Sequence, residues 1–222
     1  METVKLKTIS TLDAICENLE KDIFSMRFAP GSKITEADLT SRYGVSRNTV
    51  REAIALMLSN GILEKVANKG VFVRKISSDD LCEIFHLRGL LESEAIRMVV
   101  SSGNIPIELM QLAEEVESID PIDDWERHLE ADIGFHEALV ASTGSSRLIR
   151  LYQSILAEVK LCIFQSHSIV IPKAEKVTQH MQILKAMEED DLEKALILLD
   201  KHMESAISSY EAGIHEKEGN LL

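Results

Sequence analysis

The order of the elements predicted over the first 75 residues constrains the fold most. Apolar residues recur at helical spacing over 8–26, which predicts a helix, and Ala29-Pro30-Gly31 then interrupts the helical pattern. Two short helices are expected at 35–43 and 46–60, separated by a turn that contains glycine. Residues 62–74 have apolar, β-branched ends around an Asn-Lys-Gly turn, which predicts a β-hairpin. This order of helices, turn and hairpin is that of a winged helix-turn-helix.

From residue 78 onward the sequence shows only helical periodicity. We expect helices at roughly 78–101, 105–118, 121–142, 145–168, 172–189 and 191–213. A hydrophobic fraction of 45% with only 5% aromatic residues suits helices packed around aliphatic cores. The predicted fold class is therefore mostly α: an N-terminal winged helix-turn-helix domain with a small β-hairpin wing, followed by an all-α antiparallel helical bundle. We expect a DNA-binding domain over 1–75 and an effector-binding and dimerisation domain over 76–222.

The charge of the chain is unevenly distributed between these two regions. Residues 1–75 contain 12 Lys/Arg and 9 Asp/Glu, a net charge of +3. Residues 76–222 contain 12 Lys/Arg and 28 Asp/Glu, a net charge of −16, so the total of −13 hides a basic head. This distribution allows the N-terminal region alone to bind DNA.

The sequence also bears on the compartment. No stretch approaches the roughly 18 apolar residues that span a bilayer, and the N-terminal residues lack the apolar run of a secretory signal. Cys16, Cys82 and Cys162 are far apart and match no disulfide or zinc spacing. We therefore expect a cytoplasmic protein with reduced thiols and no membrane partner.

The N-terminal turn of the second short helix carries the candidate DNA-binding residues. Arg47 and Arg51 stand four residues apart on one helix face, and an arginine can donate two hydrogen bonds to guanine O6 and N7. The hydroxyls of Ser46 and Thr49 suit phosphate oxygens, and Asn48 is another small polar residue there. The alternative is an ordinary amphipathic helix with solvated arginines.

The sequence around these residues resembles a known family. YGVSRNTVREAI, followed by NGILE and KGVFV, is similar to the DNA-binding domain of GntR-type bacterial regulators over about residues 8–75. The resemblance implies that the recognition helix binds the major groove of a palindromic operator and that the wing reaches the minor groove. It makes Arg47 and Arg51 contacts to bases or phosphates, and places Lys69 and Gly70 at the wing tip. Because a palindrome mirrors a two-fold axis, a homodimer on double-stranded DNA is expected.

This chain departs from the family pattern at two positions of the recognition helix. Asn48 stands where the family often has another small residue, and Thr49 where proline is frequent. These differences would tune the choice of operator without altering the fold.

The acidic bundle contains four candidate metal ligands on apolar helix faces. Asp132 and His136 share one stripe at a spacing of four residues, while His180 and His202 lie on the apolar stripes of two later helices. A buried, unpaired carboxylate is costly, and a divalent ion would neutralise the group. Three imidazoles and one carboxylate suit Zn²⁺, Ni²⁺ or Mn²⁺. His128, which lies one turn before Asp132 and is expected to be exposed, is a possible substitute ligand. The alternative to a metal site is an ordinary core cluster in which these side chains are hydrogen-bonded to one another.

Arg88 lies on the apolar stripe of the first bundle helix. An inward-facing arginine needs an anionic partner. That partner is either a nearby glutamate such as Glu92, or the carboxylate of a bound ligand held by two hydrogen bonds.

Three segments of the bundle resemble the C-terminal effector domain of the FadR subgroup of GntR regulators. They are EIFHLRGLLESEAIRMV, DIGFHEALVASTGSSRLIRLY and HMQILKAMEEDDLEKALILLDKHM, within a resemblance that covers 78–212. In metal-binding members an Asp-x-x-x-His pair and two later histidines hold the ion, and such domains often bind small organic acids. The resemblance thus implies a metal at Asp132, His136, His180 and His202 and favours Arg88 as an effector ligand. Ser145 stands where the family commonly has asparagine, with no large effect expected.

These observations favour a transcription regulator that is not an enzyme. Its operator affinity would be controlled by a small carboxylate bound at a metal-containing site in the bundle. Two alternatives stay open: a constitutive repressor whose metal is purely structural, and a metal-dependent hydrolase, which would leave the winged helix unexplained.

Overall fold

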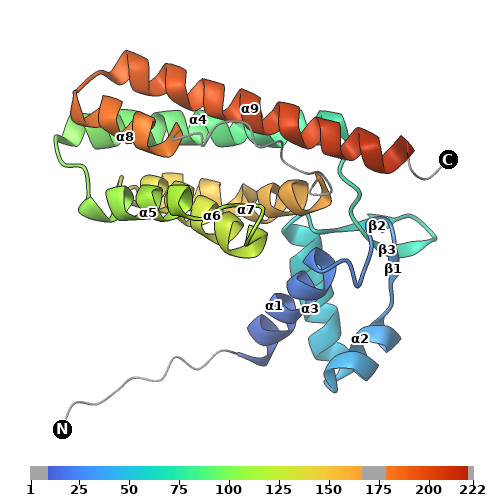
Figure 1. Cartoon of the computed structure of the whole chain (residues 1–222). Coiled ribbons are helices and arrows are strands. Elements are labelled where there is room, and N and C mark those ends of the chain that lie inside the picture. Colours follow the sequence, from blue (N-terminus) through green and yellow to red (C-terminus); the bar gives the residue numbers. More distant parts are fainter. Residues whose placement is uncertain (1–9, 167–178, 220–222) are drawn as a thin grey trace, which may run out of the picture. The chain divides into compact units, whose positions relative to one another are not determined.

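The computed structural model describes residues 10–166 and 179–219, with side chains up to residue 211 (Figure 1). The chain divides into two compact units, Met1–Ile76 and Ser77–Leu222. The first nine residues, residues 167–178 and the last three lie outside the described part, and so do the predicted helical residues 8–9, 167–168 and 172–178.

The first unit has the helix and hairpin order that the sequence predicts. Its elements are α1 (Thr11–Phe24), β1 (Lys33–Ile34), α2 (Glu36–Tyr43), α3 (Arg47–Ser59), β2 (Leu63–Val66) and β3 (Gly70–Val73). Side-chain oxygens cap the three helices, because Ser10, Thr35 and Ser46 each accept a hydrogen bond from a backbone N–H of the first turn. Gly44 ends α2 in the left-handed conformation, with φ of 66°. This is a winged helix-turn-helix, as predicted.

The wing contains the predicted hairpin, β2 and β3, and β1 adds a third strand to make a small antiparallel sheet. Its strand order is β1-β3-β2, with Lys33 opposite Phe72 and Leu63 opposite Val73. No sequence pattern predicts β1, because a strand of two residues is too short to show alternation. The additional strand pairs the free edge of β3 and fixes the base of the wing.

A small aliphatic core holds the first unit together. The apolar face of α3 supplies Val50, Ala53 and Met57, each fully buried, and Leu19 of α1 and Leu39 of α2 pack into the same core. Burying a valine, leucine or methionine side chain stabilises the fold by about 1.5–3 kcal/mol. The opposite face of α3 remains exposed, which leaves its arginines available to a partner.

The second unit is an all-helical bundle. Its described helices are α4 (Ser78–Ser102), α5 (Ile107–Ser118), α6 (Trp125–Ala141), α7 (Ser146–Ser166), α8 (Gln179–Glu188) and α9 (Leu192–Gly219). Within this unit α4 packs against α9, α7 and α6, while α8 packs against α9 and α5 (Figure 1). The three helices that carry the candidate metal ligands, α6, α8 and α9, all contact α4. In the described part of the chain, no helix is long and apolar enough to cross a membrane.

One predicted helix start in the bundle is wrong. A helix was expected from residue 121, but α6 begins at Trp125. The Asp120 carboxylate accepts from the Ile122 N–H at 2.9 Å, and the Asp124 carboxylate accepts from the Arg127 N–H at 3.1 Å. These side chains form a turn and then a helix cap, two roles that aspartate fulfils better than a position inside a helix.

Candidate metal centre and DNA-binding surface

The first turn of α3 presents the predicted DNA-binding residues to solvent. Ser46, Arg47, Asn48 and Arg51 are exposed, and Thr49 is half-buried. The Ser46 hydroxyl accepts from the Thr49 N–H at 3.2 Å and lies 2.8 Å from the Thr49 hydroxyl. Both hydroxyls therefore already take part in capping the recognition helix. Any phosphate contact has to use their remaining hydrogen-bonding capacity.

Arg51 is paired with Glu36 of α2 across the helix-turn-helix. Its Nε lies 2.7 Å from the Glu36 carboxylate, and both side chains are largely exposed. The hydrogen bond from Arg51 lowers the pKa of Glu36, and the same bond raises the pKa of Arg51. An exposed ion pair is worth only about 0–1 kcal/mol. Arg51 can therefore exchange Glu36 for a base or phosphate at little cost.

The wing tip adopts a conformation that depends on glycine. Asn68 and Gly70 have positive φ values of 61° and 117°, and Lys69 between them is exposed. A Cβ atom on Gly70 would lie 3.0 Å from Cε of Lys33, which belongs to the unpredicted strand β1. Lys33 thus lies beside Gly70 and adds a basic side chain near the wing tip, a neighbour that the hairpin prediction alone could not identify.

An anionic anchor that no local sequence pattern predicts joins α1 to α2. The Asp22 carboxylate accepts from Arg42 Nη2 at 2.5 Å and from the Tyr43 hydroxyl at 2.7 Å, and Arg27 Nε lies 3.2 Å away. Burial would raise the pKa of Asp22, but the hydrogen bonds from Arg42 and Tyr43 outweigh it and hold the pKa below its ordinary value. The same burial and the Asp22 charge raise the pKa of Tyr43. The anchor therefore holds α1 against the end of α2, the helix that precedes α3 in the chain.

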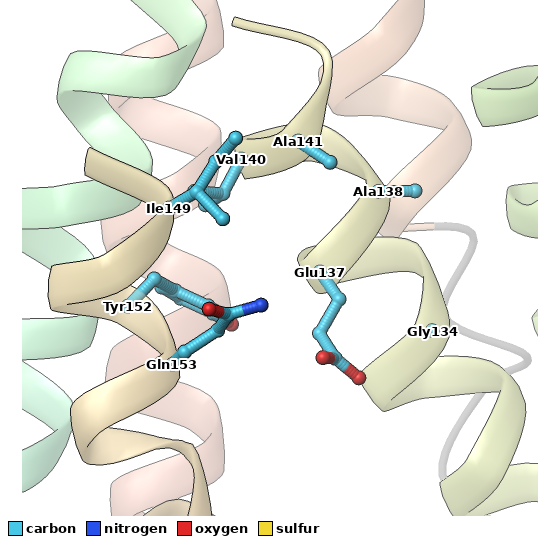
Figure 2. Close-up of a pocket in the computed structure, with 8 residues that line it drawn as sticks. All are labelled: Gly134, Glu137, Ala138, Val140, Ala141, Ile149, Tyr152 and Gln153. Carbon is cyan, nitrogen blue, oxygen red and sulfur yellow. The ribbon is translucent and has the colours of Figure 1, made fainter. Parts of the chain in front are cut away.

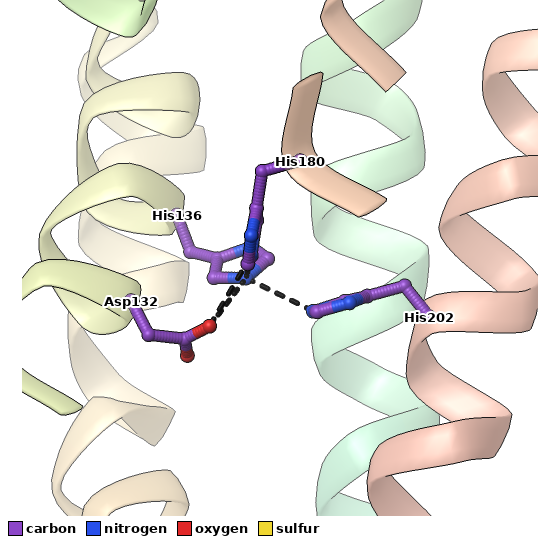
Figure 3. A group of neighbouring side chains, drawn as sticks. All are labelled: Asp132, His136, His180 and His202. Carbon is purple, nitrogen blue, oxygen red and sulfur yellow. Dashed lines mark hydrogen bonds and ion pairs between the residues drawn. The ribbon is translucent and has the colours of Figure 1, made fainter. Parts of the chain in front are cut away.

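In the bundle, the four predicted metal ligands lie together (Figure 3). Asp132 and His136 come from α6, His180 from α8 and His202 from α9. His136 Nε2 lies 3.2 Å from Nε2 of both His180 and His202, and His180 Nε2 lies 3.2 Å from Asp132 Oδ1. One ligand atom of each residue lies within 4.8 Å of all the others. Three helices thus direct four donor atoms to one point.

These separations fit a divalent ion. Nitrogen and oxygen ligands about 2.1 Å from one ion are separated by about 2.9–3.4 Å in tetrahedral or octahedral geometry. Three of the separations between these donor atoms are 3.2 Å, that between His136 Nε2 and Asp132 Oδ1 is 3.9 Å, and all four atoms lie within 4.8 Å of one another. The donor set therefore suits Zn²⁺, Ni²⁺ or Mn²⁺.

The outer nitrogens of two of these histidines are already bound by oxygen acceptors. His136 Nδ1 lies 2.7 Å from Glu92 Oε2, and His202 Nδ1 lies 2.7 Å from Gln179 Oε1. Metal-binding histidines commonly donate their second N–H in this way. Burial lowers the pKa of both His136 and His202, which disfavours a shared proton between their facing nitrogens. A cation between those nitrogens fits the arrangement better.

Arg88 lies at the side of this cluster, inside the bundle. Its Nε donates to Glu92 Oε1 at 2.8 Å, so the ion pair that was one of the two alternatives is present. Its guanidinium carbon lies 5.3 Å from the Phe85 ring centroid, and its Nη2 has no hydrogen-bond partner among the described residues. Burial would lower the pKa of Arg88, but the Glu92 carboxylate outweighs it and raises that pKa, so the guanidinium stays charged. A buried, charged donor without a partner is a place where an anion can bind.

Two further features lie close to this centre but do not belong to it. His128 is half-buried, not exposed as predicted, and its ring centroid lies 6.3 Å from that of Trp125, with the two rings tilted. It does not belong to the donor cluster. A separate open cleft of about 350 Å³ lies between α6 and α7, where Glu137 and Gln153 face each other (Figure 2). Tyr152 lines this cleft, and its hydroxyl donates to Glu92 at 2.8 Å inside the bundle.

A winged helix-turn-helix joined to a helical bundle with a buried donor cluster defines a class of DNA-binding regulators. Residues 11–73 match the family of bacterial regulatory proteins called gntR, and residues 83–205 match the FCD domain. The chain belongs to the GntR family of bacterial transcription regulators and carries an FCD domain, as its resemblance to the FadR subgroup predicts. It is therefore a regulator and not an enzyme.

Individual relatives agree with this membership. The transcriptional regulator BphR of Paraburkholderia xenovorans (strain LB400) is 30% identical over 207 residues, which is 90% of this chain and 84% of BphR. The transcriptional repressor GlaR of Escherichia coli (strain K12) is 27% identical over 88% of this chain and 93% of its own length. A GntR regulator from Rhodococcus sp. RHA1 has a similar fold, with a TM-score of 0.73 at 24% identity, covering 90% of this chain and 96% of that one.

Proposed function

We propose that this regulator binds its operator as a homodimer and that a small organic acid controls its operator affinity from a metal site in the bundle. The single observation that carries the proposal is the convergence of Asp132, His136, His180 and His202 on one point beside a buried Arg88. The metal would supply a Lewis-acid position for one carboxylate oxygen. The Arg88 Nη2 would donate to the other oxygen and orient the acid.

On the DNA side, we propose that Arg47 and Arg51 contact base edges or phosphates in the major groove. Ser46, Asn48 and Thr49 would support the same turn, and Lys69 and Gly70 would reach the minor groove. Two observations support these proposed DNA contacts: the first turn of α3 is exposed, and the chain belongs to the GntR family. One such turn offers few base contacts, so two heads on a palindrome would raise effective concentration and specificity.

The direction of regulation can also be proposed. GlaR and RspR of Escherichia coli (strain K12), the second 25% identical over 197 residues, are transcriptional repressors. We propose repression for this chain as well, relieved or strengthened when the carboxylate binds. The alternative is a constitutive repressor with a purely structural metal, favoured by the near-complete burial of the three histidines. That alternative predicts metal binding without any response to acids.

Elemental analysis and thermal shift test the proposal. Protein purified without chelators should contain about one divalent ion per chain. His180→Ala should lose the ion, while His86→Ala, a control at an exposed histidine of α4, should keep it. Acetate, succinate and citrate serve as probes, and at least one should raise the melting temperature of the metal-loaded protein only. Absence of metal, with no stabilisation by added Zn²⁺, Ni²⁺ or Mn²⁺, would overturn the proposal.

A further inference from the structure

Glu92 lies at the centre of a buried hydrogen-bond network in the bundle. It belongs to α4 and is fully buried. Its Oε1 accepts from Arg88 Nε and from the Tyr152 hydroxyl, both at 2.8 Å, and its Oε2 lies 2.7 Å from His136 Nδ1. One carboxylate therefore joins α4, α6 and α7, and both of its oxygens are in use.

The contact with Glu92 determines which nitrogen of His136 carries the proton. An ionised carboxylate can only accept hydrogen bonds, so Nδ1 of a neutral His136 must be the donor. The other nitrogen, Nε2, then keeps its lone pair. That nitrogen is the one that faces His180 and His202 at 3.2 Å. Glu92 thus selects the His136 tautomer that can bind a metal.

The same carboxylate also holds Arg88. Arg88 donates to Glu92 through Nε alone, which fixes the plane of the guanidinium against the Phe85 ring. Nη2, which has no hydrogen-bond partner among the described residues, remains available to another acceptor. The Coulomb interactions of Arg88 extend to Asp132, a member of the donor cluster. Glu92 therefore orients both His136, a candidate metal ligand, and Arg88, the cation proposed to bind the effector.

We infer that Glu92 is a positioning residue that holds His136 ready for the metal and Arg88 ready for the carboxylate ligand. It contacts neither the ion nor the acid, and it links the two binding events through its two oxygens. Tyr152 supports it with a single hydrogen bond from α7. The inference rests on the proposed function, because it assumes that the donor cluster binds a metal.

Replacing Glu92 by glutamine tests the inference with almost no change in volume. The amide can donate N–H to His136 Nδ1, which would move the ring proton to Nε2 and block the metal-binding lone pair. Glu92→Gln should therefore weaken Zn²⁺ or Ni²⁺ binding about 10–100-fold, the usual effect of losing such an outer partner. Glu94→Gln, an exposed glutamate of the same helix, is the matched control and should bind the metal as the wild type does. Competition with a chromophoric chelator measures both.

A spectroscopic readout separates positioning from mere stability. In metal-free wild type, ¹⁵N chemical shifts of histidine should show His136 with its proton on Nδ1, and in Glu92→Gln they should show the change of tautomer. If His136 of the metal-free wild type carries its proton on Nε2, the inference is overturned. Equal metal affinity and equal shifts in wild type and Glu92→Gln would overturn it too.

Glutamine at 92 leaves Arg88 without its counter-ion, so this variant could fail to fold. In that case Tyr152→Phe is the variant to test, because this substitution removes only one hydrogen bond to Glu92 and keeps the aromatic ring. A few-fold loss of metal affinity is expected there, and an unchanged affinity together with an Nε2 proton on His136 refutes the role. A wild type that binds no metal but shows the Nδ1 tautomer would sink the proposed function while leaving the Glu92–His136 contact as described.

Discussion

The two candidate sites of this regulator lie in opposite physical environments. In the N-terminal unit, Arg47, Arg51 and Lys69 are exposed on one turn of a helix and one hairpin tip. In the bundle, Arg88, Glu92 and the three histidines of the donor cluster are buried and come from four helices. The net charge follows the same division, +3 over residues 1–75 and −16 over 76–222.

In the N-terminal unit, the residues expected to bind DNA are not the ones that stabilise the fold. In the bundle, the same buried residues are expected to serve both ligand binding and stability. An exposed arginine can be removed with little effect on the core, so its loss should appear in DNA affinity alone. A buried ionic group contributes to the packing that surrounds it, so its loss should appear in stability and in ligand binding together.

The largest effect is expected from Arg88→Met. It keeps most of the side-chain volume but leaves Glu92 as an uncompensated buried charge, which should lower the free energy of unfolding of the bundle by about 3–5 kcal/mol. Arg47→Met in the exposed turn of α3 is the matched control and should change stability by less than about 0.5 kcal/mol. Chemical denaturation measures both variants. Similar losses in the two would remove the contrast between the units.

Removing the metal should have the next largest effect. An ion that binds only the folded bundle adds about 2.7 kcal/mol when its free concentration is 100 times its dissociation constant. Chelation should therefore lower the melting temperature of the wild type and have little effect on His180→Ala, which lacks one ligand. Calorimetry with and without chelator measures the shift. A chelator effect of equal size in both proteins would show that the ion binds elsewhere.

In the N-terminal unit, Arg51→Ala should weaken operator binding by about 1–3 kcal/mol if the guanidinium makes a bidentate base contact. Its unfolding free energy should stay nearly constant, because only an exposed ion pair with Glu36 is lost. Gel-shift titration at fixed salt on an operator selected from random DNA gives the affinity. Unchanged affinity and unchanged base preference would remove Arg51 from the DNA-binding surface.

The smallest predicted effect is the pH dependence of the N-terminal unit. The pKa of Asp22 is lowered in the folded state, so its contribution to stability is complete above the ordinary aspartate pKa. That contribution is lost as pH falls below this value and through the lower folded pKa. Asp22→Asn should abolish this part of the acid dependence. Chemical denaturation of the wild type and Asp22→Asn between pH 5 and pH 2 measures this acid dependence. The pH range brackets the ordinary aspartate pKa of about 3.9.

The sequence predicted those features that depend on local spacing. The winged helix-turn-helix follows from helix periodicity, caps and a turn within 75 residues, and Asp132 and His136 follow from a spacing of four on one apolar stripe. The contacts of Glu92 with His136 and Tyr152 join residues 44 and 60 positions apart, and no local pattern indicates such pairs. The Asp22–Arg42 anchor and the pairing of β1 with β3 depend on tertiary contacts in the same way.

Control of transcription by an acid requires that the buried site of the bundle communicates with the exposed DNA-binding surface. Operator affinity of the metal-loaded wild type should be measured with and without acetate, succinate and citrate, beside His180→Ala under the same conditions. We expect at least one acid to change the wild-type dissociation constant about 5–150-fold, the usual range of allosteric coupling, and to leave that of His180→Ala unchanged. Identical operator affinity of the wild type with every acid, although one of them binds the metal-loaded bundle, would contradict it.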